Sequence, residues 1–265
     1  KRDIETLSNK HGSIVKELID YYHKKSLTND DIFSIYEKMP ELHILTSLFD
    51  SSRYEEIKER IKDSKYGFSM DNLLSLNKDL NSFNHISEVE TFLQYISGSK
   101  KEQQFENDDK SIFGRIKKIS LNLNTRTKLC NNYFTTQLWF LPFGIGNPIN
   151  EVSKALKEIM LNDNILKKYE ILILNSNADK PVNDIKETIH KCELVAKFNK
   201  KDGLIILAGN MCSLGITLPL CDVVMLFNNI LSSDKIYQMM MRTMTESLTT
   251  PKKCGYVVDL NTNRV

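Results

Sequence analysis

The stretch FNKKDGLIILAGNMCSLGITLPLCDVVMLFNN, residues 198–229, decides the fold because it holds two short apolar runs separated by a loop. The runs are GLIILAG (203–209) and DVVMLFN (222–228). Strands this apolar need cover on both faces, as in parallel sheets flanked by helices. The stretch therefore predicts two buried strands of a mostly parallel sheet.

Apolar runs and amphipathic helices alternate on either side of this stretch. We expect further strands at QLWFLPF (137–143), EILILNS (170–176) and CGYVVDL (254–260). Helices are expected at NEVSKALKEIMLN (150–162), with an asparagine cap, at NDIKETIHKCELVAKFNK (183–200) and at KIYQMMMRTMTES (235–247). Such alternation is typical of an α/β fold with helices on both faces of the sheet and ligands at the carboxyl ends of the strands.

Residues 1–110 show a different pattern. Amphipathic helices are predicted over 12–25, 32–39 and 51–63, and TNDD (28–31) is a capping box before the second of them. The stretch SGSKKEQQFENDDKS (97–111) is polar and aperiodic, as in a linker or exposed loop. We therefore expect a mainly helical accessory or inserted region at 1–110 and an α/β domain at 111–265.

The composition narrows the class of protein. The chain has 265 residues, 41% of them hydrophobic, and a net charge of +2, with the positive surplus in residues 111–265. That surplus is compatible with a polyanionic partner. No apolar run is long enough to cross a bilayer and the first residues lack a signal-peptide core, so we expect an intracellular location (cytoplasm, nucleus or virion) and no membrane partner.

Cysteine and histidine usage indicates neither disulfides nor metal. The sequence contains no CxxC pair and no HExxH spacing. We expect five reduced core thiols and no metal site. The cysteines are Cys130, Cys192, Cys212, Cys221 and Cys254.

The stretch 198–229 and the helix after it resemble the second RecA-like domain of superfamily 2 helicases. Gly215, Ile216 and Thr217, with Pro219, stand in the place of motif V. The four fixed positions of motif VI, Gln-x-x-Gly-Arg-x-x-Arg, are occupied by Gln238, Met241, Arg242 and Thr245, so the second and fourth depart from the pattern. TTQLWFLPFGIGNPINEVSKAL (135–156) resembles motif IV, and MRTMTES (241–247) resembles helicases of large DNA viruses.

The resemblance implies a RecA-like fold and the C-terminal motor half of an ATP-dependent helicase or translocase. ATP and Mg²⁺ would be the cofactors, and the backbone of DNA or RNA would be a partner. Neither GxxxxGK[ST] nor a DExH-like box occurs in the chain, so the first RecA-like domain that completes the ATP site is expected to belong to the same, longer protein. A larger transcription or replication assembly is a further expected partner.

The resemblance also implies site residues. Arg242 and Gln238 would be catalytic, and Gly215 and Thr217 would contact the nucleotide. The nucleic-acid backbone would lie against loop residues that follow two of the strands, namely Gly144, Gly146, Asn147, Asn210 and Ser213. Each has a plainer interpretation: Arg242 as a surface arginine, Thr217 as the cap of a turn, and the others as ordinary loop residues.

The helix at 235–247 is expected to have two faces. At 100° per residue its apolar arc holds Ile236, Tyr237, Met240, Met241, Met244 and Leu248, and we expect the methionines in the core. Gln238, Arg242 and Thr245 gather on the opposite arc. The departures Met241 and Thr245 support an alternative, a non-catalytic RecA-like scaffold in a transcription or packaging assembly.

Overall fold

The computed structural model describes residues 20, 39–46, 59, 69–99, 111–122, 135–144, 148–175, 182–209, 212, 216–246, 252–261 and 264. Pro40–Val265 forms one compact unit, and Lys1–Met39 forms a second. The helices predicted at 12–25, 32–39 and 51–63 lie outside the described residues, apart from isolated positions. The sheet and the helices that pack on it belong to the unit that begins at Pro40.

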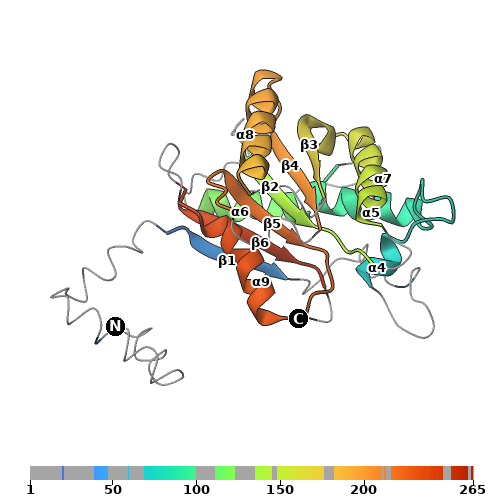
Figure 1. Ribbon diagram of the computed structural model, residues 1–265, viewed down its shortest axis with the longest axis horizontal. Coiled ribbons are helices and arrows are strands. Elements are labelled where there is room, and N and C mark those ends of the chain that lie inside the picture. The colour runs from blue at the N-terminus through green and yellow to red at the C-terminus, as the bar shows by residue number, and fades with distance from the viewer. Residues whose placement is uncertain are drawn as a thin grey trace. The chain divides into compact units, whose positions relative to one another are not determined.

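Six parallel strands form one sheet in the order β1-β6-β5-β2-β4-β3, with β1 and β3 at its edges (Figure 1). The strands are β1 (Glu41–Thr46), β2 (Thr135–Phe140), β3 (Tyr169–Leu174), β4 (Gly203–Ala208), β5 (Cys221–Leu226) and β6 (Cys254–Asp259). Four of them, β2, β4, β5 and β6, are buried along their whole length. This confirms the α/β class with a mostly parallel sheet and all five predicted strands.

Helices cover both faces of the sheet, and alternate residues of each strand serve the two faces. The α7 face packs against α4 (Met70–Leu73), α5 (Ile86–Ser97), α6 (Ile112–Asn122) and α7 (Ile149–Asn162). The α9 face packs against α8 (Val182–Phe198), Cys212, the segment 216–218 and α9 (Ser233–Met240). Two short 3₁₀ turns complete the elements, η2 (Leu166–Lys168) and η3 (Met241–Met244).

The alternation of side chains between the two faces is clearest on β2. Trp139 and Phe140 are both fully buried, yet Trp139 belongs to the core of the α7 face and Phe140 to that of the α9 face. Trp139 makes an edge contact with Phe227, at 5.5 Å between ring centroids, and its Nε1 donates to Oε1 of Gln137. A one-residue shift of the strand would exchange the two cores, so this pair fixes the register.

The unit extends further towards the N-terminus than the sequence pattern predicts. Strand β1 pairs with β6 along its whole length, and α5 and α6 share the core of the α7 face. The boundary expected near residue 110 therefore does not coincide with the boundary of this unit, which lies at Pro40. The polar stretch 97–111 misled because it joins two helices of the same core; an accessory role for residues 1–110 stays a prediction.

Candidate functional site

The segment that resembles motif VI folds as a helix that tightens at its end. Helix α9 begins after Ser232, carries Asp234 in its first turn and passes into the 3₁₀ turn η3 at Met241. Met239 and Thr243 are its buried residues, while Ile236 and Met240 are half-buried against the core of the α9 face. The helix predicted at 235–247 is thus confirmed in its position.

The predicted apolar arc of this helix is wrong in its centre. Tyr237 is 61% exposed, and the buried positions are Met239 and Thr243 instead. Met239 and Thr243 are four residues apart and therefore share one face of the helix, and this face lies against the sheet in place of the one that carries Tyr237. Met244 and Thr245 are half-exposed.

Close contact with β6 fixes η3. A Cβ atom on Gly255 would lie 2.5 Å from the carbonyl oxygen of Thr243 and 2.6 Å from its Cβ, so only glycine allows this approach. Gly255 is the second residue of β6, and η3 therefore crosses the α9 face near the amino end of that strand. The position of Arg242 depends on this contact.

Arg242 joins η3 to the segment that resembles motif V. Its Nε donates to the carbonyl of Gln238 at 3.1 Å, and its Nη1 donates to the carbonyl of Ile216. The structure thus brings together two predicted motifs that lie more than twenty residues apart in sequence. The contact with Gln238 goes through the backbone, and both side chains are half-buried.

The segment after β4 alternates between core and solvent. Ile216 and Leu218 are buried, whereas Thr217 and Pro219 are exposed. Cys212 is buried with a positive φ of 68°. Burial raises the pKa of the Cys212 thiol to about 12, and the charge of nearby Arg242 partly opposes the rise. Of this segment, Thr217 therefore presents a hydroxyl to solvent beside the Arg242 contact.

The carboxyl edge of the sheet holds a second group of predicted residues. Gly144 is exposed just beyond β2, and a Cβ there would meet no heavy atom within 4 Å. Helix α7 begins at Ile149 after Pro148, and no side chain caps it. The predicted asparagine cap is wrong, because Asn150 lies inside the first turn. Gly146, Asn147, Asn210, Ser213 and Gly215 lie outside the described residues.

Asn175 organises this edge, and the sequence reasoning missed it. Its Nδ2 donates to Oγ of Ser153 at 2.8 Å and to the carbonyl of Ile149 at 3.3 Å, and its Oδ1 accepts from the amide of Gly209 at 3.1 Å. One side chain thereby ties the end of β3 to the start of α7 and the end of β4. A polar residue directly after a buried strand was the available signal.

Arg264 was missed as well. Its guanidinium forms a two-point ion pair with Asp259, at 2.8 Å for each contact, and also donates to the carbonyls of Leu226 and Ile230. The pair is almost fully buried. This arginine joins the carboxyl ends of β5 and β6, so its role in the described structure is to hold the edge together.

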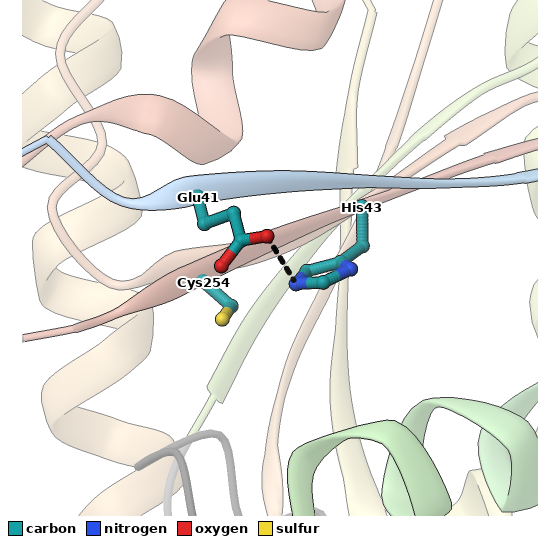
Figure 2. A group of neighbouring side chains, drawn as sticks. All are labelled: Glu41, His43 and Cys254. Atoms are coloured by element: carbon teal, nitrogen blue, oxygen red, sulfur yellow. Dashed lines mark ion pairs between the residues drawn. The ribbon is translucent and has the colours of Figure 1, made fainter. Parts of the chain in front are cut away.

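Acidic, imidazole and thiol groups meet at the other end of the sheet, where β1 pairs with β6. One ligand atom each from Glu41, His43 and Cys254 lies within 4.8 Å of the other two (Figure 2). No spacing in the sequence indicates this group, because Cys254 comes from the far end of the chain. The four described cysteines are free thiols; Cys212, Cys221 and Cys254 are buried, as expected of core thiols, whereas Cys192 is half-buried.

The comparisons with known proteins include one family match. Residues 149–245 match the family described as helicase conserved C-terminal domain. This part of the chain is similar to a helicase C-terminal domain. The match starts at the first residue of α7 and ends at Thr245, directly after η3. The predicted resemblance to a helicase C-terminal domain is thereby confirmed for residues 149–245, and the resemblance to helicases of large DNA viruses stays a prediction.

Several solved structures are similar to the chain. One is the C-terminal part of the Fun30 ATPase domain, with 14% identity, a TM-score of 0.40, and coverage of 83% of this chain and 84% of that one. Another is domain 2 of the DEAD-box helicase Mss116p bound to an RNA duplex, with 13% identity, a TM-score of 0.33, and coverage of 56% and 48%.

The third is the ATP-dependent Type ISP restriction-modification enzyme LlaBIII bound to DNA. Its identity is 13%, its TM-score 0.41, and the coverage is 86% of this chain and 12% of that one. No curated protein sequence matches the chain significantly. In the described part of the molecule, none of the helices has the length and apolarity that a bilayer crossing requires.

Proposed function

We propose that this chain is the C-terminal motor half of an ATP-dependent superfamily 2 helicase or translocase that acts on nucleic acid. The observation that carries the proposal is the helicase C-terminal match over 149–245, which includes both segments that Arg242 joins. The chain would bind a nucleic-acid strand and supply Arg242 to ATP held by a first RecA-like domain of the same protein.

Arg242 has chemistry suited to that task. Transfer of a γ-phosphoryl group spreads negative charge over the phosphate oxygens, and an arginine brought in from a second domain neutralises it. In the described state the guanidinium donates to two neutral carbonyls, those of Gln238 and Ile216. Bonds to phosphate oxygens are charge-assisted and stronger, so bound ATP would draw the guanidinium away from these carbonyls.

The exposed hydroxyl of Thr217 fits the border of such an ATP site. It lies next to Ile216, whose carbonyl Arg242 contacts, and could bond to the nucleotide. The groups that cradle the triphosphate and hold Mg²⁺ would come from the first RecA-like domain. Gln238 would support Arg242 from the same helix.

The carboxyl edge of the sheet would follow the nucleic-acid backbone. Gly144 is open to solvent there, and α7 begins shortly afterwards at Ile149, with N-terminal amides that suit phosphate oxygens. Asn175 holds α7, β3 and β4 in fixed relation at this edge. Such contacts recognise the backbone and carry no sequence preference.

Nucleic-acid binding can be tested with two matched charge insertions. In the longer protein, we expect the affinity for nucleic acid to depend strongly on salt. Gly144→Glu places a carboxylate at the proposed surface and should weaken this binding several-fold. Phe198→Glu is the control, since Phe198 is 87% exposed at the end of α8, near the amino edge of the sheet. Equal effects of the two substitutions would contradict the proposed surface.

The motor proposal itself can be tested by measuring ATP turnover. The samples are a pure preparation of this chain and the longer protein, the latter with and without nucleic acid. We expect no measurable turnover from the chain alone, and turnover stimulated by nucleic acid from the longer protein. Robust hydrolysis by the chain alone would refute the division of labour between two domains.

A second function, a non-catalytic RecA-like scaffold in a transcription or packaging assembly, is favoured by one observation. Met241 and Thr245 replace two fixed residues of motif VI, and the described bonds of Arg242 already have a structural use. Absence of turnover in the longer protein, with partner binding retained, would decide for the scaffold.

A further inference from the structure

Strands β1 and β6 place three metal-binding residue types on one face of the sheet edge. In the parallel register Glu41 pairs with Cys254 and His43 pairs with Tyr256. Residues two apart on a strand share a face, so Glu41 and His43 project to the same side as their paired neighbours. Figure 2 shows the carboxylate and imidazole from β1 pointing toward the thiol from β6. The backbone amide of Glu41 bonds to the carbonyl of Lys253 at 2.6 Å and fixes the start of β1.

The imidazole of His43 is oriented by its surroundings. Its ring stacks on Tyr256, with centroids 5.5 Å apart and planes inclined by 22°, and the hydroxyl of Tyr256 lies 2.8 Å from Oγ of Ser120. The Nε2 atom is buried and has no hydrogen-bond partner among the described residues; Oε1 of Glu41 lies 3.8 Å away. A buried nitrogen in this state requires a partner, and a metal ion would supply one.

The donor set selects the ion. A thiolate, an imidazole and a carboxylate together suit Zn²⁺, whereas Mg²⁺ and Ca²⁺ take oxygen ligands. Bonds of about 2.0–2.3 Å to a tetrahedral zinc ion put its ligand atoms roughly 3.5 Å apart. The three atoms lie within 4.8 Å of one another, so they need to close by about 1 Å. Glu41, with its side chain 69% exposed, has room to move.

We propose that Glu41, His43 and Cys254 form a zinc site that fastens the edge strand β1 to β6. Three protein ligands leave a fourth position for water. Coordination replaces the proton of the Cys254 thiol with the metal, so binding releases that proton to solvent. Zinc binds the paired strands and not the separated ones, and it therefore stabilises the whole unit against unfolding.

The test is a titration of the reduced, chelator-treated chain with Zn²⁺, and with Co²⁺ as a coloured substitute, followed by thermal melts. We expect one ion per chain, a thiolate-to-cobalt absorption band that zinc abolishes, and a melting temperature raised by several degrees. Glu41→Gln, at an exposed side chain, should fold normally and bind at least tenfold more weakly. Cys254→Ser should lose the absorption band.

The matched control is Cys192→Ser, because Cys192 is a half-buried thiol on α8 outside the cluster. It should bind metal as the unchanged chain does. Zinc or cobalt binding that is equally strong in the Cys254→Ser and Glu41→Gln variants would overturn the proposal, as would a thiolate band that disappears with Cys192→Ser. Absence of stoichiometric binding by the unchanged chain would overturn it as well.

Discussion

The two faces of the sheet are built from the same strands and differ in what covers them. The α7 face packs against four helices through an apolar core that includes Trp139, Ile205 and Met225. The α9 face is covered in part by irregular chain, namely Cys212, the segment 216–218 and the 3₁₀ turn η3, and its contacts include the backbone bonds of Arg242. The cover of the α7 face is mainly helical and apolar, whereas the less regular part of the cover of the α9 face supplies the polar groups around Arg242.

The two faces also differ in what a substitution would change. On the α7 face, apolar side chains that interlock determine which substitutions are tolerated. On the α9 face the close approach of η3 to Gly255 determines where Arg242 lies. Substitutions in the apolar core of the first face should therefore change stability alone, and substitutions at the contact between η3 and Gly255 should also move Arg242.

The adjacent residues Trp139 and Phe140 provide a direct comparison of the two cores. Replacing Trp139 by alanine leaves a large cavity against Phe227 and should lower the free energy of unfolding by about 3–5 kcal/mol. Phe140→Ala should cost a similar amount from the α9 face. Denaturant unfolding of both variants measures this, and a loss below about 1 kcal/mol for Trp139→Ala would show that the α7 face is loosely packed.

Gly255→Ala tests whether close packing holds η3. The added methyl meets the backbone of Thr243 at 2.5 Å, so we expect about 1–3 kcal/mol of destabilisation and a displaced Arg242. Gly144→Ala is the control, because its Cβ would enter open space. Equal melting temperatures for the Gly255→Ala variant and the unchanged chain would mean that η3 lies further from β6 than described.

Thr245→Arg restores the second arginine of motif VI. Thr245 is half-exposed in extended conformation just after η3, so we expect the melting temperature to change by less than a few degrees. In the longer protein, single-turnover hydrolysis should hold or rise, because a second guanidinium could reach the same phosphate. A large fall in the melting temperature would show that the side chain of Thr245 is needed in the core. If neither the unchanged protein nor the Thr245→Arg variant hydrolyses ATP, the result would favour the scaffold.

Glu193 on α8 gives a small, pH-dependent effect. Burial raises the pKa of this carboxyl, against the opposing hydrogen bond from Thr136 and the charges of Lys197 and His190. Because the folded pKa is the higher one, stability is lost as the pH rises through it. Glu193→Gln keeps the acceptor for Thr136 and removes the ionisation.

The Glu193→Gln variant should therefore be more stable than the unchanged chain by up to about 1 kcal/mol near neutral pH. The difference should vanish below the ordinary carboxyl range, near pH 4. Unfolding free energies at several pH values measure it. A difference independent of pH would assign the effect to packing.

The strands and helices from residue 135 onward could be predicted from the sequence. Short continuous apolar runs indicate buried strands, and apolar residues spaced at the helical period indicate amphipathic helices. Strand β1 was missed because ELHILT is short, has one fully buried residue and lies within a region of helical periodicity. Its place depends on pairing with β6, more than two hundred residues away in the chain. Local pattern carries no information about such a partner.

The candidate site residues that belong to a sequence motif could be predicted. Those that depend on tertiary contacts could not. The positions of Gln238 and Arg242 followed from the motif, and the structure brings Arg242 to Ile216. The buried face of this helix is marked by Met239 and Thr243, and the apolar arc in the sequence did not identify it because Thr243 is polar. Asn175, Gly255 and the group of Glu41, His43 and Cys254 depend on contacts between distant segments.

Arg242→Ala in the longer protein tests most directly whether this chain completes an ATP site. Its control is Lys235→Ala, which removes an exposed cation from the same helix. We predict that single-turnover ATP hydrolysis falls by about 10³–10⁵ for Arg242→Ala, with ATP affinity nearly unchanged, and that Lys235→Ala alters neither. Loss of the bonds to Gln238 and Ile216 should lower the unfolding free energy by only about 1–3 kcal/mol. Turnover equal to that of the unchanged protein would contradict the proposal and would leave Arg242 as a structural link between η3 and the segment at Ile216.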